Sequence, residues 1–254
     1  MSTQTSGTHH RFFLYLPPHL VPRSLGVSSS FQTIDKQLAP RIYQILRLQP
    51  GETITFFTGV EVIDVCLTQS PQPKTTITGT VTGFYEVPPR PRTMVAALSL
   101  LKKDAFEAAV YSAAQMGCEI ITPVITAKSR QKYMNDREPE RLQSIIIAAC
   151  EQSKNPHIPK LAAPVTLEQI LNRYKKSTLV CFDADGCSLP ELATALTQTN
   201  NNVCTLIGPE GGLVPDELAT IAAAGAVTAR LTKTILRSRD AACLGLGVVS
   251  SVVL

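Results

Sequence analysis

The feature that most constrains this chain is a short apolar run that leads directly into a glycine-rich turn. Val203 to Ile207 is apolar and rich in β-branched residues, which is typical of a buried strand. Gly208 to Gly212 then supplies three glycines, whose backbone readily takes positive φ and lets a ligand approach closely. Pro215, followed by the acids Asp216 and Glu217, indicates the start of a helix. This order of strand, glycine turn and helix predicts a ligand-binding edge of an α/β sheet.

The turn differs from the standard phosphate-binding loops. It lacks the lysine and the Ser/Thr of a P-loop, and its glycines do not follow the GxGxxG spacing. Glu210, in the middle of the turn, would repel a phosphate. A neutral or cationic ligand that is recognised through backbone N–H and C=O groups therefore fits better. The alternative is a tight turn that only joins the strand to the helix.

The residues after this helix carry a second set of signals. Ala226 to Leu231 is predicted to be a strand, Thr232 to Ser238 a polar and basic loop, and the remaining Ala/Gly/Leu/Val-rich tail a buried helix. The segments IGPEGGLVPDEL, at 207–218, and LTKTILRSRDAA, at 231–242, together resemble the RsmE family of ribosomal RNA methyltransferases. That family belongs to the SPOUT superfamily, whose members use S-adenosylmethionine. The resemblance covers nearly the whole chain, and the motif from Gly208 to Gly212 is its most specific part.

The composition is that of an ordinary soluble globular protein: of 254 residues, 44% are hydrophobic and 17% are charged. The formal net charge of +4 is compatible with an RNA partner but does not require one. The seven cysteines lack metal-ligand spacing, so we predict no metal site. Cys66, Cys181, Cys204 and Cys243 lie in apolar runs, which predicts small core residues in a reducing cytoplasm. No apolar run is long enough to span a membrane.

The chain divides into a tail and two structured regions. Residues 1–10 are predicted to be a disordered tail. Residues 11–87 are predicted to form a small β-barrel, with a helix within 34–48 that starts near Ala39. Residues 86–93 are a proline-rich linker, and in residues 93–254 strands and helices alternate. The predicted strands are 12–16, 53–57, 61–68, 75–84, 94–101, 119–126, 179–182, 203–207 and 226–231, and the predicted helices 105–116, 142–152, 167–174, 189–198, one from about Pro215 and the C-terminal tail.

The resemblance implies a specific fold for each region. Residues 11–87 would be a PUA-like RNA-binding β-barrel, and residues 93–254 a SPOUT methyltransferase domain. That domain is an α/β fold, with a parallel sheet flanked by helices and a C-terminal segment that threads through a loop as a trefoil knot. Basic residues are candidates for RNA contacts, although a solvated charged face is an alternative for each of them. These candidates are Arg11, Arg41, Arg47, Lys102, Lys128 and Arg130.

The resemblance also implies the cofactor and the reaction. S-adenosyl-L-methionine would be held by three loops, and the product would be N3-methyluridine in small-subunit ribosomal RNA. Arg237 matches the arginine of the family's I-L-R segment and is the catalytic candidate, because a cation would stabilise the uridine as its N3 proton is lost. A phosphate clamp or a salt bridge to Glu210 are the alternatives for Arg237. The candidate cofactor-binding residues are Phe182, Asp183, Leu206, Ile207, Gly208, Glu210, Gly211, Gly212, Leu231, Thr234, Ile235 and Leu236.

Several residues depart from the family pattern, and they fall on the RNA-facing and catalytic side. A SPOUT enzyme with a different RNA substrate, and a non-catalytic RNA-binding protein that keeps the fold, are therefore alternatives. The family's dimers make the tail Cys243–Leu254 either a homodimer surface or the buried final helix. The departures are Tyr111, Ser112, Gln115, Ala127, Lys128, Asn155, Thr234 and Arg239.

Overall fold

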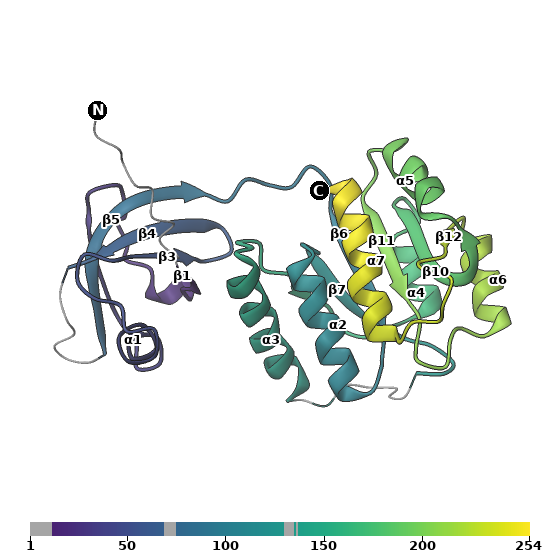
Figure 1. Cartoon of the computed structure of the whole chain (residues 1–254), viewed down its shortest axis with the longest axis horizontal. Coiled ribbons are helices and arrows are strands. Elements are labelled where there is room, and N and C mark those ends of the chain that lie inside the picture. The colour runs from purple at the N-terminus through teal and green to yellow at the C-terminus, as the bar shows by residue number, and fades with distance from the viewer. Residues whose placement is uncertain (1–11, 69–74, 130–134, 136) are drawn as a thin grey trace. The chain divides into compact units, whose positions relative to one another are not determined.

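The computed structural model describes residues 12–68, 75–129, 135 and 137–254. The chain forms two compact units, Met1–Pro88 and Pro89–Leu254 (Figure 1). The predicted tail, residues 1–10, lies outside the described residues, as do Arg11 and Arg130. All seven cysteines are free thiols. Among the described residues, no helix is long and apolar enough to cross a membrane, and no cluster of His, Cys, Asp or Glu side chains is arranged to hold a metal ion.

The first unit is built around a five-stranded sheet with the strand order β1-β3-β4-β5-β2. β1 runs parallel to β3, whereas the other neighbouring pairs are antiparallel. Side chains from all five strands meet in one core, which also takes Ala39 and Ile42 from the helical segment. The elements are β1 (Phe12–Tyr15), η1 (Pro18–Leu20), β2 (Ser30–Ile34), α1 (Leu38–Pro40), the π-helical turn η2 (Arg41–Ile45), β3 (Thr53–Phe57), β4 (Glu61–Leu67) and β5 (Thr76–Glu86).

The predicted helix within 34–48 starts at Leu38, next to the expected Ala39, but a strand that was not predicted occupies the residues before it. Ile34 belongs to β2, and its side chain is 61% exposed. Asp35 separates the strand from the helix, because its carboxylate accepts the backbone N–H groups of Gln37 and Leu38. Only Leu38 to Ile45 is helical. The apparent spacing of Ile34 and Leu38 therefore joins residues from two different elements.

The second unit contains a seven-stranded sheet with the order β12-β10-β11-β6-β7-β8, and β9 also pairs with β7. Every strand pair in it is parallel, as predicted for an α/β fold. The central strand β6 is buried along its whole length, which is expected where helices cover both faces of a parallel sheet. The strands are β6 (Met94–Ser99), β7 (Ile120–Ile125), β8 (Lys160–Leu161), β9 (Val165–Thr166), β10 (Thr178–Cys187), β11 (Val203–Ile207) and β12 (Val227–Ala229).

In the described part of the second unit, helices cover this sheet on both faces (Figure 1). α7, the yellow C-terminal helix, packs against α2, α5 and the strands β6 and β11. α4 and α6 contact each other, and their apolar side chains join a core with the opposite face of β10 and β11. The helices are α2 (Lys103–Gln115), α3 (Glu138–Ser153), α4 (Leu167–Arg173), α5 (Leu189–Thr197), α6 (Pro215–Ala223) and α7 (Ser238–Val253).

The cysteine prediction is confirmed in part. Cys181 and Cys204 are buried in the core of the second unit, and Cys66 is half-buried. Cys243 is exposed, so the prediction of a core role is wrong for it. The reason is that α7 buries Ala242, Leu246, Val249 and Val253, whose helical spacing places Cys243 outside the buried stripe.

Candidate functional site

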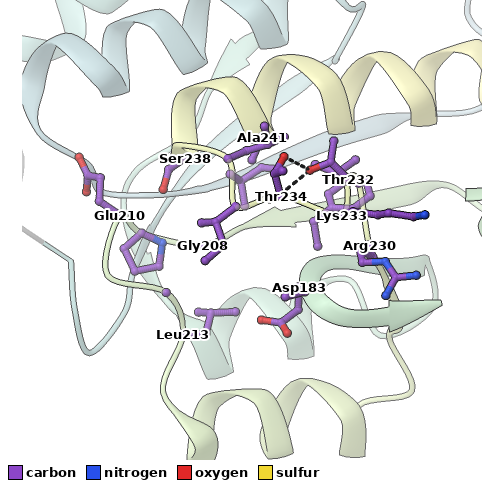
Figure 2. Close-up of a pocket in the computed structure, with 18 residues that line it drawn as sticks. Asp183, Gly208, Glu210, Leu213, Arg230, Thr232, Lys233, Thr234, Ser238 and Ala241 are labelled. Atoms are coloured by element: carbon purple, nitrogen blue, oxygen red, sulfur yellow. Dashed lines mark hydrogen bonds between the residues drawn. The ribbon is translucent and has the colours of Figure 1, made fainter. Parts of the chain in front are cut away.

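Two loops, after β11 and β12, and an irregular segment of β10 meet at the carboxyl edge of the parallel sheet. They enclose a cavity of about 490 Å³ together with the first turns of α7 (Figure 2). Carboxyl ends of adjacent parallel strands share one edge, which is why segments far apart in the sequence converge here. The residues that line the cavity are Phe182, Asp183, Ala184, Ile207, Gly208, Pro209, Glu210, Gly212, Leu213, Arg230, Leu231, Thr232, Lys233, Thr234, Ile235, Leu236, Ser238 and Ala241.

The glycine bend, residues 208–212, is the loop after β11. Its turn closes with a hydrogen bond of 2.9 Å from the Gly212 N–H to the Pro209 carbonyl. Gly212 has φ of +69°, a backbone conformation that residues with a Cβ adopt only with strain. A Cβ added there would meet no atom within 4 Å, so glycine is required by the backbone conformation and not by lack of space. α6 then begins at Pro215, and Glu217 accepts the Val214 N–H at 2.9 Å. The predicted strand, glycine turn and helix are all observed.

The loop after β12 forms the opposite side of the cavity. It is joined to β10 where the Arg230 N–H donates to the Cys187 carbonyl at 2.8 Å. Within the loop, the Thr232 hydroxyl donates to the Thr234 carbonyl at 2.5 Å (Figure 2). Ile235 is 95% exposed although it borders the cavity. A large apolar side chain in that position is available to pack against a bound molecule.

The end of β10 supplies the third wall. The pairing with β12 shifts register between Phe182 and Cys187, and Asp183 and Ala184 within this irregular segment line the cavity. Gly186 permits this, because its Cα lies against the Ala229 backbone and a Cβ there would overlap that backbone. The Phe182 ring packs against Gly245 of α7. Asp183 accepts the Asp185 N–H at 3.2 Å and places a carboxylate at the cavity.

Most of the predicted cofactor-binding residues come together here. Leu206 does not, because its side chain is 4% exposed and belongs to the core below α4 and α6. Gly211 is also absent from the lining. The predicted residues that line the cavity are Phe182, Asp183, Ile207, Gly208, Glu210, Gly212, Leu231, Thr234, Ile235 and Leu236. The lining residues that were not predicted all directly neighbour predicted residues, except Ala241 in the first turns of α7. They are Ala184, Pro209, Leu213, Arg230, Thr232, Lys233, Ser238 and Ala241.

Arg237, the predicted catalytic residue, is the N-cap of α7 and is exposed. It follows the lining residue Leu236 but is itself outside the lining. The alternative of a salt bridge to Glu210 is not observed between these two described residues. Glu210 instead accepts the backbone N–H of Lys102 at 3.1 Å.

The predicted RNA-contacting residues are distributed over both units. Arg47 is exposed and Arg41 half-buried in the first unit. In the second unit Lys102 and Lys128 are exposed, and they follow β6 and β7 at the same sheet edge as the cavity. The ammonium group of Lys128 donates to the Gly211 carbonyl at 2.8 Å. Lys128 is therefore attached to the outside of the glycine bend.

One departure from the family pattern has an internal role. The Asn155 side chain accepts from the Arg90 guanidinium at 3.0 Å and donates to the Ala114 carbonyl at 3.0 Å. It also accepts the His157 N–H at 3.1 Å. Burial lowers the pKa of His157, and the adjacent Arg90 charge lowers it further. Asn155 thus joins the linker, α2 and the segment after α3, at 8% exposure.

A parallel sheet with a pocket built by the loops at its carboxyl edge defines an α/β domain that binds a small ligand. The sequence profile of the RNA methyltransferase domain family matches residues 88–250 of this chain. The chain belongs to this RNA methyltransferase family.

Individual relatives agree with this family. The ribosomal RNA small subunit methyltransferase E of Mycobacterium tuberculosis is 25% identical over 214 residues, which cover 81% of this chain and 80% of the relative. The enzyme of the same name from Synechocystis is 28% identical over 164 residues, covering 63% of this chain and 54% of the relative.

Solved structures have the same fold. The methyltransferase E of Neisseria gonorrhoeae bound to S-adenosyl methionine has a TM-score of 0.79 at 22% identity, covering 95% of this chain and 98% of that chain. The Legionella pneumophila putative methyltransferase Lpg2936, in complex with the same cofactor, has a TM-score of 0.76 at 24% identity, covering 96% and 98%.

Proposed function

We propose that this chain transfers a methyl group from S-adenosyl-L-methionine to N3 of a uridine in small-subunit ribosomal RNA. The observation that carries the proposal is the cavity of about 490 Å³ between the irregular part of β10 and the loops after β11 and β12. Membership of the RNA methyltransferase family supports RNA as the substrate class. The names of the curated relatives support the small ribosomal subunit as its source.

The lining fits this cofactor. The volume of the cavity is within the range of roughly 300–1,000 Å³ that is usual for small-molecule sites. Leu213, Leu231 and Leu236 supply apolar surface for a purine ring, and the glycine bend exposes backbone N–H and C=O groups. The lining also carries charges of both signs, with Asp183 on one strand end and Arg230 and Lys233 on another. A methionine moiety, which bears both a carboxylate and an ammonium group, matches this mixed charge.

The chemistry required of the protein is modest. When bound, S-adenosyl-L-methionine supplies a methyl group that is already activated by its sulfonium. The two loops and the β10 segment position the two reactants and exclude water, which gives the rate advantage of a fixed geometry. The base must leave its stack to enter, and the 95% exposed Ile235 at the mouth offers an apolar surface for it.

Arg237 is the residue that we propose acts on the base. A guanidinium keeps its charge at all physiological pH values, so it stabilises a uridine that is losing its N3 proton. Arg237 is exposed and follows the lining residue Leu236 directly, so it is available to RNA from the solvent side of the mouth. Arg173, the last residue of α4, is also exposed, does not line the cavity, and serves as the control.

We extend the proposal to the finer features of the fold. α7 returns to the centre of the sheet after the loop that borders the glycine bend, which supports a C-terminal trefoil knot. The mostly antiparallel sheet and single core of the first unit support a PUA-like barrel, with Arg41 and Arg47 contacting RNA. We also propose a cytoplasmic location and a homodimer through the exposed side of α7, which carries Cys243 and Leu244, together with the adjoining Leu254.

A methyl-transfer assay on small ribosomal subunits that lack the modification tests the reaction. The wild-type protein is expected to produce N3-methyluridine, and Arg237→Ala to lower kcat by about 10²–10³-fold. Arg173→Ala is expected to stay within about twofold of wild type, because Arg173 does not line the cavity. Calorimetry should give the same cofactor affinity for all three proteins. Failure of the wild-type protein to bind S-adenosyl-L-methionine would refute the proposal.

A different RNA substrate is the second candidate, and two residues favour it. Thr234 lines the cavity and Arg239 is exposed on the first turn of α7, and both depart from the family pattern. Mapping N3-methyluridine in total RNA from cells with and without the gene separates the two candidates. Loss of the mark from an RNA other than the small-subunit RNA would select the second.

A further inference from the structure

The outer side of the glycine bend is covered by a long side chain from a neighbouring loop. Lys128, in the loop after β7, donates from its ammonium group to the Gly211 carbonyl at 2.8 Å. Its aliphatic part covers Gly211 as well, because a Cβ added at Gly211 would lie 3.0 Å from Lys128 Cδ and 3.5 Å from Lys128 Cβ. Gly208 and Gly212 face the cavity, whereas Gly211 faces Lys128. The bend therefore has a ligand side and a lysine side.

Two further contacts connect the same neighbouring loops to the bend and to α6. Glu217 of α6 accepts the Ala127 N–H at 2.7 Å with one carboxylate oxygen and the Val214 N–H at 2.9 Å with the other. Glu210 accepts the Lys102 N–H at 3.1 Å. The loop that carries Lys128 is itself fixed, since the Thr126 N–H donates to the Ser129 hydroxyl at 2.9 Å and Ser129 is buried. Lys128 thus extends from a hydrogen-bonded loop to a glycine-rich segment.

The glycine content of that segment is what makes a side-chain contact useful. Glycines lose more backbone freedom on ordering than other residues, so a glycine-rich bend binds a ligand at an entropic cost. A contact that orders the bend beforehand removes part of that cost and raises ligand affinity. Lys128 is suited to this role because it fills the space above Gly211 with its methylene groups and holds the carbonyl with its charge.

We propose that Lys128 is a positioning residue, which holds the glycine bend in its ligand-binding conformation from the side opposite the cavity. This inference rests on the proposed function, because it assumes that the bend contacts S-adenosyl-L-methionine. It also revises the prediction of Lys128 as an RNA contact: its first partner is the protein backbone. The expected effect of removing Lys128 therefore falls on the cofactor rather than on RNA.

Lys128→Met tests this with Lys103→Met as the matched control. Methionine keeps most of the aliphatic volume and removes the ammonium group. Lys103, the first residue of α2, is equally exposed and makes no hydrogen bond or ion pair to the bend within the described part of the chain. We expect Lys128→Met to weaken S-adenosyl-L-methionine binding by about three- to tenfold, as for the loss of one net hydrogen bond. Its KM for the RNA should stay within about twofold of the Lys103→Met value, and Lys128→Arg should recover most of the cofactor affinity because it retains a donor.

A second readout does not involve the cofactor. Hydrogen–deuterium exchange of the peptide spanning 208–214 should be faster in Lys128→Met than in wild type and Lys103→Met. If wild type fails to bind S-adenosyl-L-methionine, the proposed function fails, while the exchange result still decides whether Lys128 orders the bend. Unchanged exchange and affinity in Lys128→Met, or a larger effect on the RNA KM than on cofactor affinity, would overturn the inference.

The packing against Gly211 adds a double-mutant test. Gly211→Ala should weaken cofactor binding in the wild-type background, because the new Cβ displaces the lysine stem at 3.0 Å. In a Lys128→Ala background the nearest remaining Lys128 atom is the Cβ at 3.5 Å, which is an ordinary contact. Gly211→Ala should then have little further effect. Additive losses would show that the two residues act independently and would contradict the inference.

Discussion

The contact between Gly245 and Phe182 makes a sharp prediction about how α7 shapes the cavity. An alanine Cβ at position 245 would overlap Phe182 Cε2 and lie 2.7 Å from Cδ2. Carbon atoms in contact are normally separated by about 3.5–4.0 Å, so the ring would have to move by roughly 1 Å or more. Alanine in a helix gains about 1 kcal/mol over glycine. Overpacking costs about 1–3 kcal/mol. Gly245→Ala should therefore destabilise the fold by about 0–2 kcal/mol and move a wall of the cavity.

Gly247→Ala is the control, because it lies on the same helix with the same gain in helix propensity. A Cβ at position 247 meets only Met116 Sδ at 3.5 Å, which is an ordinary contact. We expect this variant to be more stable than wild type by up to about 1 kcal/mol. Urea unfolding of both variants gives the two changes in unfolding free energy, and calorimetry gives the affinity for S-adenosyl-L-methionine.

Two results would refute the steric reasoning. One is a Gly245→Ala protein as stable as Gly247→Ala, and the other is a wild-type cofactor affinity in Gly245→Ala. Phe182→Leu provides the internal check, because a smaller side chain at that position leaves room for the new methyl group. The cost of Gly245→Ala should fall in the Phe182→Leu background, since residues in contact do not behave additively.

Two further changes can be predicted from the backbone and from buried thiols. Gly212 has φ of +69° and Gly225 has φ of +77°, and a Cβ added at either glycine would have no atom within 4 Å. Alanine at either site should therefore lower the free energy of unfolding by about 1–2 kcal/mol, through backbone strain alone. Urea unfolding should show similar losses, whereas calorimetry should show weaker cofactor binding only for Gly212→Ala, and equal affinities would contradict the role of the bend. Burial raises the pKa of Cys181 and Cys204 to about 12, so the unfolded chain, with thiol pKa values of about 8.5, releases these protons first as the pH rises. The free energy of unfolding, measured with urea, should therefore be at its full value below about pH 8.5 and fall between about pH 9 and 12. Iodoacetamide at about pH 8 should label the exposed Cys243 before either buried thiol.

The elements that were predicted well share a local cause. Val203–Ile207 is a strand of five buried residues, and a continuous apolar run bounded by a glycine turn has few other solutions in an α/β chain. β2 was missed because its inward positions include Thr33. The hydroxyl of Thr33 donates to the Leu20 carbonyl at 2.8 Å, a partner thirteen residues away that no local pattern reveals. Burial of a polar side chain depends on such a partner, so the alternation of this strand is hidden in the sequence.

In the candidate site too, the sequence reveals the local backbone features but not the partners of the side chains. The bend, the end of β10 and the loop after β12 were recognised because glycine, proline and strand ends mark backbone geometry directly. The partners of the charged side chains were not recognised. Glu210 accepts a backbone N–H from Lys102, and Lys128 donates to a backbone carbonyl at Gly211. Both bonds are made to backbone atoms, which every residue has, so the sequence does not indicate which residue is the partner.

The contacts of each residue also indicate which departures from the family pattern can affect the choice of RNA substrate. Ala127 contributes a backbone N–H to Glu217, and Asn155 is enclosed by Arg90, Ala114 and His157. Substitutions at these two positions act on folding. Thr234 lines the cavity and Arg239 stands exposed on the first turn of α7, so a change of RNA target would arise there. The conformation of the glycine bend depends on the positive φ of Gly212, so residues such as Thr234 and Arg239 can vary without changing the bend.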